Sequence, residues 1–138
     1  MGLTVQIRQT SASASEAAIR GHSVAIDRPV DKGGSDQGPM GGELFLAATG
    51  GCFMSTLLAA VRARDGQEAI RDLLVEVEGT LEQSPARFTA IEIRVSAECE
   101  DRALLEKLVE VAERGCIMMN TLRGTLDVRI RIGDPAAV

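Results

Sequence analysis

Aromatic residues are nearly absent from this sequence, which has three Phe but neither Trp nor Tyr in 138 residues. Its core must therefore be filled mainly by Leu, Ile, Val, Ala and Met. Histidine occurs only once, as His22, and because a metal site requires several ligands at suitable spacing, we expect no bound metal. The basic residues are dispersed and the formal net charge is -5, a pattern that does not indicate a nucleic-acid partner.

Long apolar runs and targeting signals are also missing. No stretch of roughly 18 consecutive apolar residues occurs, which argues against a membrane-spanning segment and a membrane partner. No basic segment followed by an apolar one opens the chain, so we see no signal peptide and expect a cytoplasmic protein. Three cysteines in such a chain do not suggest a disulfide scaffold, and we expect them to be reduced, buried or redox-active.

The length fits a single domain over residues 1–138. Alternation of apolar and polar residues predicts strands at residues 3–8, 17–26, 73–81, 88–97 and 125–132. In the second of these strands, Gly21 is expected to mark a bulge. Helical periodicity predicts helices over residues 43–64 and 101–115, with Asp101 capping the second helix and Gly115 ending it. The order β-β-α-β-β-α-β indicates an α+β fold with antiparallel sheets.

The helix predicted over residues 43–64 is apolar almost all the way round, which is typical of a helix buried in the middle of a protein. It would be about 33 Å long, and because so small a domain can hardly bury it, an oligomer that encloses it is favoured. Gly50 and Gly51 would each destabilise a helix interior by up to about 1 kcal/mol, so their place directly before Cys52 requires an explanation. The Gly-rich connection over residues 27–42 is long, which suggests a function or a contact with a partner subunit.

Cys52, at the centre of this apolar helix, has two interpretations. A cysteine in such a place is commonly a small buried hydrophobic residue. Alternatively, Gly50 and Gly51 remove side chains next to the sulfur and allow a substrate or another backbone to approach it. Cys116, at the end of the second helix, could be the resolving cysteine for a peroxidatic Cys52. Their sequence separation does not show whether the two residues meet. Cys99 lies between two acidic residues, and we assign it a structural or incidental role.

Three segments resemble the OsmC/Ohr family, the osmotically inducible protein C and organic hydroperoxide resistance proteins. The loop reads D-R-P at residues 27–29 and G-G-S-D-Q-G-P at residues 33–39, where the family has D-x-P and GG-x-D-x-GP. Residues 43–52 read E-L-F-L-A-A-T-G-G-C, against E-L-L-L-A-A-L-x-x-C in the family. Residues 116–122 read C-I-M-M-N-T-L, against C-P-V-x-x-T-L, so that Ile117 replaces the expected Pro. The predicted order of elements agrees with the family's over nearly the whole chain.

The resemblance implies an OsmC-like fold and an intertwined homodimer whose long central helices are enclosed by sheets. It also implies an active site at the dimer interface that reduces small hydroperoxides, organic ones in particular. There the Cys52 thiolate would attack the peroxide, release an alcohol and become a sulfenic acid. Cys116 would condense with it to a disulfide, which an external dithiol, of the lipoyl type in the family, would reduce. No bound cofactor is implied.

The resemblance also indicates which residues would assist the cysteines. Family peroxidases use an Arg and a Glu to hold the thiolate and orient the peroxide. The candidates here are Arg20, on the second predicted strand, and Glu43, at the start of the helix. In the best-studied branch the Glu corresponds to Gly42, and the N-terminal Arg motif of the hydroperoxide branch is absent. A substrate pocket, or simply part of the core, would be formed by Phe45, Phe53, Met54, Met118 and Met119.

Two other functions stay open at this point. A member of this family could bind a small apolar ligand, or sense redox state, without turning over peroxide. The chain could also be a dimeric interaction protein with inert buried cysteines. A cation close to Cys52 would favour the enzyme, whereas a disulfide between Cys52 and Cys116 would exclude only the inert cysteines.

Overall fold

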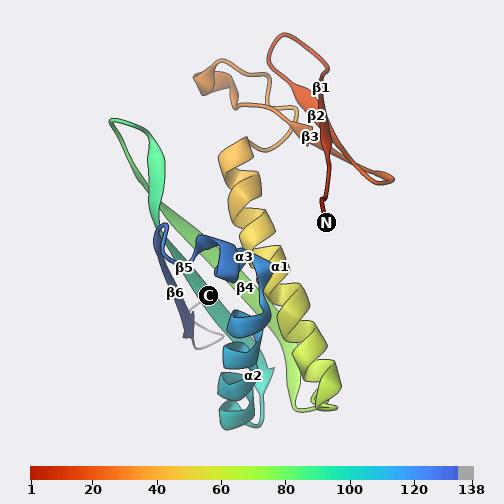
Figure 1. The fold of residues 1–138 in the computed structure, drawn as a ribbon, viewed down its shortest axis with the longest axis vertical. Coiled ribbons are helices and arrows are strands. Elements are labelled where there is room, and N and C mark those ends of the chain that lie inside the picture. The colour runs from red at the N-terminus through yellow and green to blue at the C-terminus, as the bar shows by residue number, and fades with distance from the viewer. Residues whose placement is uncertain (134–138) are drawn as a thin grey trace. The chain divides into compact units, whose positions relative to one another are not determined.

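Two three-stranded sheets and three α-helices make up the computed structural model, which describes residues 1–133 (Figure 1). The chain divides into two compact units, Met1–Phe45 and Leu46–Val138, and each unit has its own sheet. The long helix α1 (Gly41–Ala63) begins in the first unit and continues into the second. The predicted α+β class is confirmed.

The first unit contains a small antiparallel sheet in the order β1-β2-β3, followed by a single turn of 3₁₀ helix. Its elements are β1 (Gln6–Gln9), β2 (Ser15–Ile19), β3 (His22–Ile26) and η1 (Val30–Lys32). All three strands are short, and they are connected as a meander in which each strand pairs with the next along the chain.

The prediction of one strand over residues 17–26 is wrong, because the chain reverses in the middle of that segment. Ile19 of β2 pairs with His22 of β3, which leaves Arg20 and Gly21 as the turn between them. Arg20 has a φ of 55°, which is outside the β region and ends a strand. Arg20 therefore lies in a turn and not on a strand, and Gly21 does not mark a bulge.

A buried carboxylate organises the loop that follows β3. Asp27 is only 1% exposed. Its Oδ1 accepts a hydrogen bond from the Arg28 amide at 2.7 Å, and its Oδ2 accepts hydrogen bonds from the amides of Ser35 and Gln37 at 3.1 Å each. A Cβ at Gly34 would lie 1.9 Å from the Arg28 carbonyl oxygen, so this close return of the chain requires glycine. The segment predicted as an irregular connection is therefore a closed loop held by Asp27.

The second unit contains a mixed sheet in the order β4-β5-β6, and two helices lie in the connection between β5 and β6. Besides most of α1, its elements are β4 (Ile70–Glu82), β5 (Arg87–Cys99), α2 (Arg102–Gly115), α3 (Ile117–Leu122) and β6 (Asp127–Ile132). The Asp101 carboxylate accepts a hydrogen bond from the Leu104 amide at 3.0 Å, which confirms the predicted cap of α2. The short helix α3 was not predicted.

The pairing of β6 corrects one feature of the predicted sheets. β4 and β5 form the expected antiparallel hairpin, but β6 runs parallel to β5, with Ala90 opposite Asp127 and Val95 opposite Ile132. Because α2 and α3 carry the chain back to the end of the sheet where β5 begins, β6 enters in the same direction as β5. The antiparallel prediction is therefore wrong for this pair of strands.

The core of the second unit is contributed by one face of α1, by β5 and by α2. Its buried apolar side chains include Phe53, Leu57, Val61, Ile91, Ile93, Val95, Leu105, Leu108 and Ala112. The residues of β5 alternate and those of α2 recur at helical spacing, as predicted. This packing brings α1, which carries Cys52, close to the end of α2, which Cys116 follows.

Within this chain α1 is buried on one side, whereas the sequence predicts a helix buried all round. Five of its 23 residues are buried, namely Thr49, Gly50, Phe53, Leu57 and Val61. Small residues at intervals of four along another side are exposed, namely Ala47, Gly51, Ser55 and Ala59. By length and apolar composition alone α1 is also a candidate membrane span, even though polar residues interrupt it. The chain thus leaves much of the apolar surface of α1 uncovered.

Gly50 allows α1 to lie directly against β4. A Cβ at Gly50 would come within 2.6 Å of Val77 Cγ2, whereas a Cβ at Gly51 meets nothing within 4 Å. We expect Gly50→Ala to lower the free energy of unfolding by about 1–3 kcal/mol, because the stiff side chain of Val77 must move. Gly51→Ala is the matched control and, at a protein concentration at which the chain is monomeric, should raise that free energy by up to about 1 kcal/mol, since Ala is the better helix former.

Urea denaturation of the two variants beside the wild type measures both effects. Similar destabilisation by both would mean that Gly51 also faces a packed surface, such as a second copy of the chain.

Candidate active site

The cysteines of the two sequence motifs meet in the second unit. The Cys116 thiol donates a hydrogen bond to Cys52, with 3.4 Å between the two Sγ atoms. Because a disulfide bond spans about 2.05 Å, a small movement of the two side chains would be enough to form one. The two residues are 64 positions apart in the sequence, so their meeting depends on how the helices pack.

A close contact between two helices brings the sulfurs together. Thr56, one turn after Cys52 on α1, donates a hydrogen bond from its hydroxyl to the Cys52 carbonyl oxygen at 3.0 Å. A Cβ at Gly115 would lie 3.4 Å from Thr56 Cγ2, so the end of α2 lies against this turn of α1. Cys116 follows directly, between α2 and α3. Gly115, predicted to end α2, therefore lies beside α1, and Cys116 follows it next to Cys52.

The two sulfurs differ in their surroundings. Cys116 is fully buried, with 0% of its surface exposed, whereas Cys52 is partly exposed. Burial raises the pKa of the Cys116 thiol above its ordinary value, and the neighbouring Cys52 adds to this increase, although hydrogen bonds from the amides of Met119 and Met118 offset part of it. Cys116 is therefore protonated at neutral pH and available as a hydrogen-bond donor, while Cys52 is the sulfur that a substrate can reach.

Arg20 and Glu43, the residues predicted to assist Cys52, both belong to the first unit. Arg20 is exposed in the turn between β2 and β3. Glu43 Oε1 accepts a hydrogen bond from the Met40 amide at 2.9 Å, as an acid in the third position of a helix does when it reaches back to cap the first turn. Glu43 therefore has a structural role at the start of α1. That either residue acts on Cys52 stays a prediction.

The residues predicted to form an apolar pocket have several different environments. Phe53 is fully buried in the core and Met119 is 3% exposed. Met118 is half-buried next to Cys116, and Phe45, at the end of the first unit, is half-buried as well. Met54 lines two cavities of about 380 and 410 Å³ along α1. That these five residues together surround a substrate stays a prediction.

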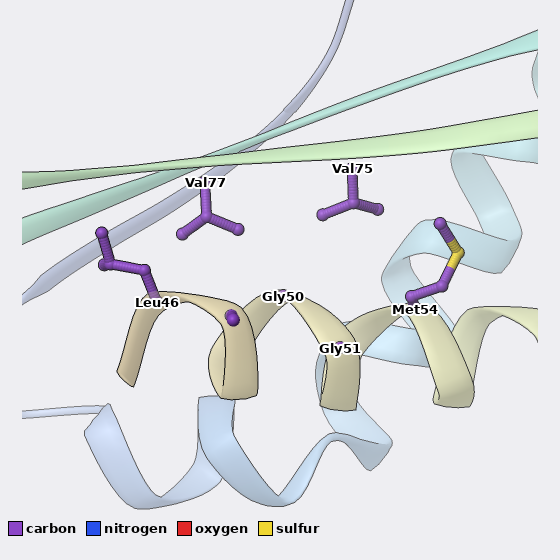
Figure 2. A pocket seen from close by; sticks show the side chains of 7 residues that line it. Leu46, Gly50, Gly51, Met54, Val75 and Val77 are labelled. Atoms are coloured by element: carbon purple, nitrogen blue, oxygen red, sulfur yellow. The ribbon is translucent and has the colours of Figure 1, made fainter. Parts of the chain in front are cut away.

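The two cavities lie on the opposite side of α1 from Cys52. Figure 2 shows the first of them, where Leu46, Gly50 and Met54 of α1 face Val75 and Val77 of β4. Successive residues of an α-helix are rotated by about 100°, so Cys52, two residues after Gly50, points about 200° away from it. The cavities are thus separate from the cysteine pair. Sequence reasoning missed them, although the Gly50-Gly51 pair was a signal of free space beside α1.

The second cavity is lined by apolar side chains from the later part of α1 and from β4, and by three polar ones. Its lining residues are Met54, Leu58, Val61, Arg62, Gln67, Ile70, Asp72 and Leu73. Cys99, the third cysteine, ends β5 opposite Ile70 and is a free thiol. Over residues 1–133, no group of three or more His, Cys, Asp or Glu residues is arranged to hold a metal ion.

Comparison with known proteins identifies the family of this chain. The family described as OsmC-like protein matches residues 33–131, which is well over half of the sequence. The chain belongs to the OsmC-like protein family. It is 28% identical over 116 residues to the uncharacterized protein YmaD of Bacillus subtilis. This alignment covers 78% of this chain and 75% of that protein. It is 25% identical over 137 residues to an organic hydroperoxide resistance protein of Xanthomonas axonopodis pv. citri, covering 92% of this chain and 96% of that protein.

The fold of this OsmC-like protein is also that of its solved relatives. The crystal structure of an OsmC-like protein from Mycoplasma pneumoniae superposes on it with a TM-score of 0.83 at 16% identity, over 97% of each chain. The predicted OsmC-like fold is therefore confirmed. The segment that matches the family includes Glu43, Cys52 and Cys116, whereas Arg20 lies outside it.

Proposed function

We propose that this OsmC-like protein is a thiol-dependent peroxidase that reduces small hydroperoxides, with organic hydroperoxides preferred. The observation that carries the proposal is the 3.4 Å contact between the sulfurs of Cys52 and Cys116. The likeness over 92% of the chain to a protein named for organic hydroperoxide resistance supports the substrate class.

The different exposure of the two sulfurs supports the roles that we propose for them. The Cys52 thiolate attacks the distal peroxide oxygen, the O–O bond breaks, and the alkoxide takes up a proton and leaves as the alcohol. Cys52 is then a sulfenic acid, and the adjacent Cys116 thiol displaces its hydroxyl as water to form the disulfide. An external dithiol, of the lipoyl type, donates two electrons and restores both thiols. In this proposal Arg20 and Glu43 hold the thiolate and orient the peroxide, and no bound cofactor takes part.

Turnover of cumene hydroperoxide by the full chain, with dihydrolipoamide as reductant, tests the proposed function. We expect turnover with both peroxides when hydrogen peroxide is measured alongside, and a higher kcat/KM for cumene hydroperoxide. No turnover by protein whose three thiols are titrated as reduced would contradict the proposal.

A second candidate function is the binding of a small apolar ligand, with or without redox sensing. It is favoured by the cavity of about 380 Å³ between α1 and β4, whose lining side chains are apolar. Because this cavity is on the far side of α1 from Cys52, ligand binding there would persist in a protein that has no peroxidase activity. This function becomes the leading one if the turnover experiment fails.

We further propose that the protein is a homodimer in which the second copy covers α1. The exposed small residues along α1 allow another backbone to approach closely, and Leu58 on the same side is 41% exposed. We expect Leu58→Glu to weaken dimerisation by at least about tenfold in Kd, since a charge would be buried in an apolar contact. Val111→Glu on α2, whose wild-type side chain is 43% exposed, is the matched control and should leave the dimer intact.

Sedimentation equilibrium of the two variants and the wild type measures the association. A monomeric wild type at micromolar concentration would refute the proposed dimer.

A further inference from the structure

We infer that the reducing thiol attacks Cys52, and not Cys116, in the oxidised protein, so that the mixed disulfide with the reductant forms on Cys52. This inference rests on the proposed disulfide between the two cysteines. It goes beyond the proposed function because it names the sulfur that the reductant contacts and the sulfur that leaves.

Access to the two sulfurs is the first argument. A thiolate attacks a disulfide along the line of the S–S bond, from the side opposite the sulfur that leaves, so that side of the attacked sulfur must be open. Cys116 is 0% exposed, and the amides of Met118 and Met119 donate hydrogen bonds to its sulfur from the protein side. Cys52 is partly exposed. The attack that the structure admits is therefore the one on Cys52.

Neither formation of the disulfide nor dimerisation exposes the Cys116 sulfur. The sulfurs are already 3.4 Å apart, so closing the bond requires only a small movement and leaves the packing around Cys116 in place. Gly115, the preceding residue, lies beside Thr56 of α1, since a Cβ added to it would be 3.4 Å from Thr56 Cγ2. A second copy of the chain, as in the proposed homodimer, can only cover surface that is now exposed, and turnover in that dimer requires it to leave Cys52 open. A fully buried sulfur therefore stays inaccessible in the dimer.

The surroundings of Cys116 affect the step only after access has selected the sulfur that is attacked. When the reductant's sulfur bonds to Cys52, the S–S bond breaks and its electron pair remains on Cys116 as a thiolate. The amides of Met118 and Met119 stabilise this thiolate as it forms, but burial raises the pKa of the Cys116 thiol, which slows its departure and favours its protonation afterwards. Protonation slows the return attack of Cys116 on the mixed disulfide, which is a less reactive electrophile than the sulfenic acid with which Cys116 condenses in the proposed reaction.

The chemical class of the reductant follows from this order of events. The second thiolate of a dithiol attacks its own first sulfur, forms a cyclic disulfide and releases Cys52 as a thiolate, which completes a two-electron reduction. A monothiol cannot do this within one molecule, and attack by Cys116 on Cys52 would only expel the monothiol and restore the internal disulfide. A monothiol is therefore expected to leave the protein blocked at Cys52.

The experiment uses the wild-type chain, oxidised with diamide and freed of excess reagent. It is mixed with 2-mercaptoethanol for a series of short times, quenched in acid, alkylated with N-ethylmaleimide and digested with trypsin. Cleavage after Lys and Arg places Cys52 in residues 33–62 and Cys116 in residues 115–123, which mass spectrometry separates. At the earliest times we expect the mercaptoethanol adduct on Cys52 and alkylation on Cys116, in excess over the reverse pattern by at least about tenfold.

The same chain supplies the controls for this experiment, and two results would contradict the inference. Cys99 lies in its own peptide, residues 95–102, and an adduct there measures nonspecific exchange. Cys116→Ser and Cys52→Ser, each loaded with mercaptoethanol, supply the reference peptides. An early adduct mainly on Cys116 would overturn the inference, and so would the lack of any disulfide between Cys52 and Cys116 after diamide. Because diamide forms the disulfide, the result does not depend on peroxide turnover, and failure of the proposed peroxidase is detected separately.

Discussion

Replacing Cys52 by Ser should lower the rate of peroxide turnover by roughly 10³-fold or more, because the Ser hydroxyl is a far weaker nucleophile than a thiolate. The fold should be unchanged, since Ser is close to Cys in size. Cys99→Ser is the matched control, because Cys99 lies at the end of β5 and should be irrelevant to turnover. Stopped-flow or coupled assays with cumene hydroperoxide and dihydrolipoamide measure the three proteins side by side.

Cys116→Ser separates the two steps of the same reaction. This variant should still consume one equivalent of peroxide at close to the wild-type rate, because Cys52 is intact. It should then stop as the sulfenic acid, since no thiol lies beside Cys52 to condense with it. Dimedone labelling of Cys52, followed by mass spectrometry, detects that species. If Cys52→Ser instead retained turnover that Cys116→Ser lost, the roles of the two cysteines would be reversed.

Asp27→Asn is expected to have the largest effect on the first unit. The carboxylate accepts hydrogen bonds from three amides, and the carboxamide of Asn turns a donor toward some of them. We expect the amides of Ser35 and Gln37 to exchange with solvent roughly ten- to a hundredfold faster in the variant. Asp31→Asn, at an exposed position in η1 of the same loop, is the matched control and should leave both amides protected. Hydrogen exchange followed by NMR measures these rates.

The same carboxylate should make the stability of the protein depend on pH. Burial raises the pKa of Asp27, but hydrogen bonds from the amides of Arg28, Gln37 and Ser35 and from the Ser13 side chain lower it by more, so that it lies below the ordinary value of 3.8. A group with a lowered pKa in the folded state stabilises that state fully above the ordinary value. This contribution is lost as the pH falls below 3.8 and through the folded pKa.

The difference in unfolding free energy between wild type and Asp27→Asn should therefore be constant above that range and shrink as the solution is acidified. Urea denaturation of both proteins over the acid range tests this dependence. A difference that does not change down to the lowest pH at which both proteins still fold would mean that Asp27 does not titrate there.

Regular spacing and sequence motifs account for what could be predicted. Leu105 and Leu108 recur at helical spacing after a capping Asp101, so α2 was predicted with nearly its observed bounds. The alternation through Ile91 and Ile93 placed β5 in the same way. The motifs around Cys52 and Cys116 identified the cysteines that the structure brings together. Each of these signals lies within one helix, strand or short motif, and can therefore be recognised in a single sequence.

The remaining features depend on contacts that spacing does not reveal. The two-residue turn at Arg20 and Gly21 shifts the alternation of residues 17–26 by one position, because Ile19 pairs with His22 and Ala17 with Val24. The consecutive small residues Ala17 and Ala18 obscure this shift in the sequence. Helix α3 has six residues, which is less than two turns and too short for a helical period. The cavities beside α1 and the parallel register of β6 arise from tertiary packing alone.

The parallel pairing of β6 has a consequence for how the chain folds. β4 and β5 are joined by a short turn and can pair as soon as both are made, whereas β6 must return across α2 and α3 before it finds β5. Closing this longer connection loses more chain entropy, so we expect the hairpin to form early and β6 to dock late. Cys116 lies within that connection, between α2 and α3. We therefore expect Cys116 to reach Cys52 late in folding, as this connection closes.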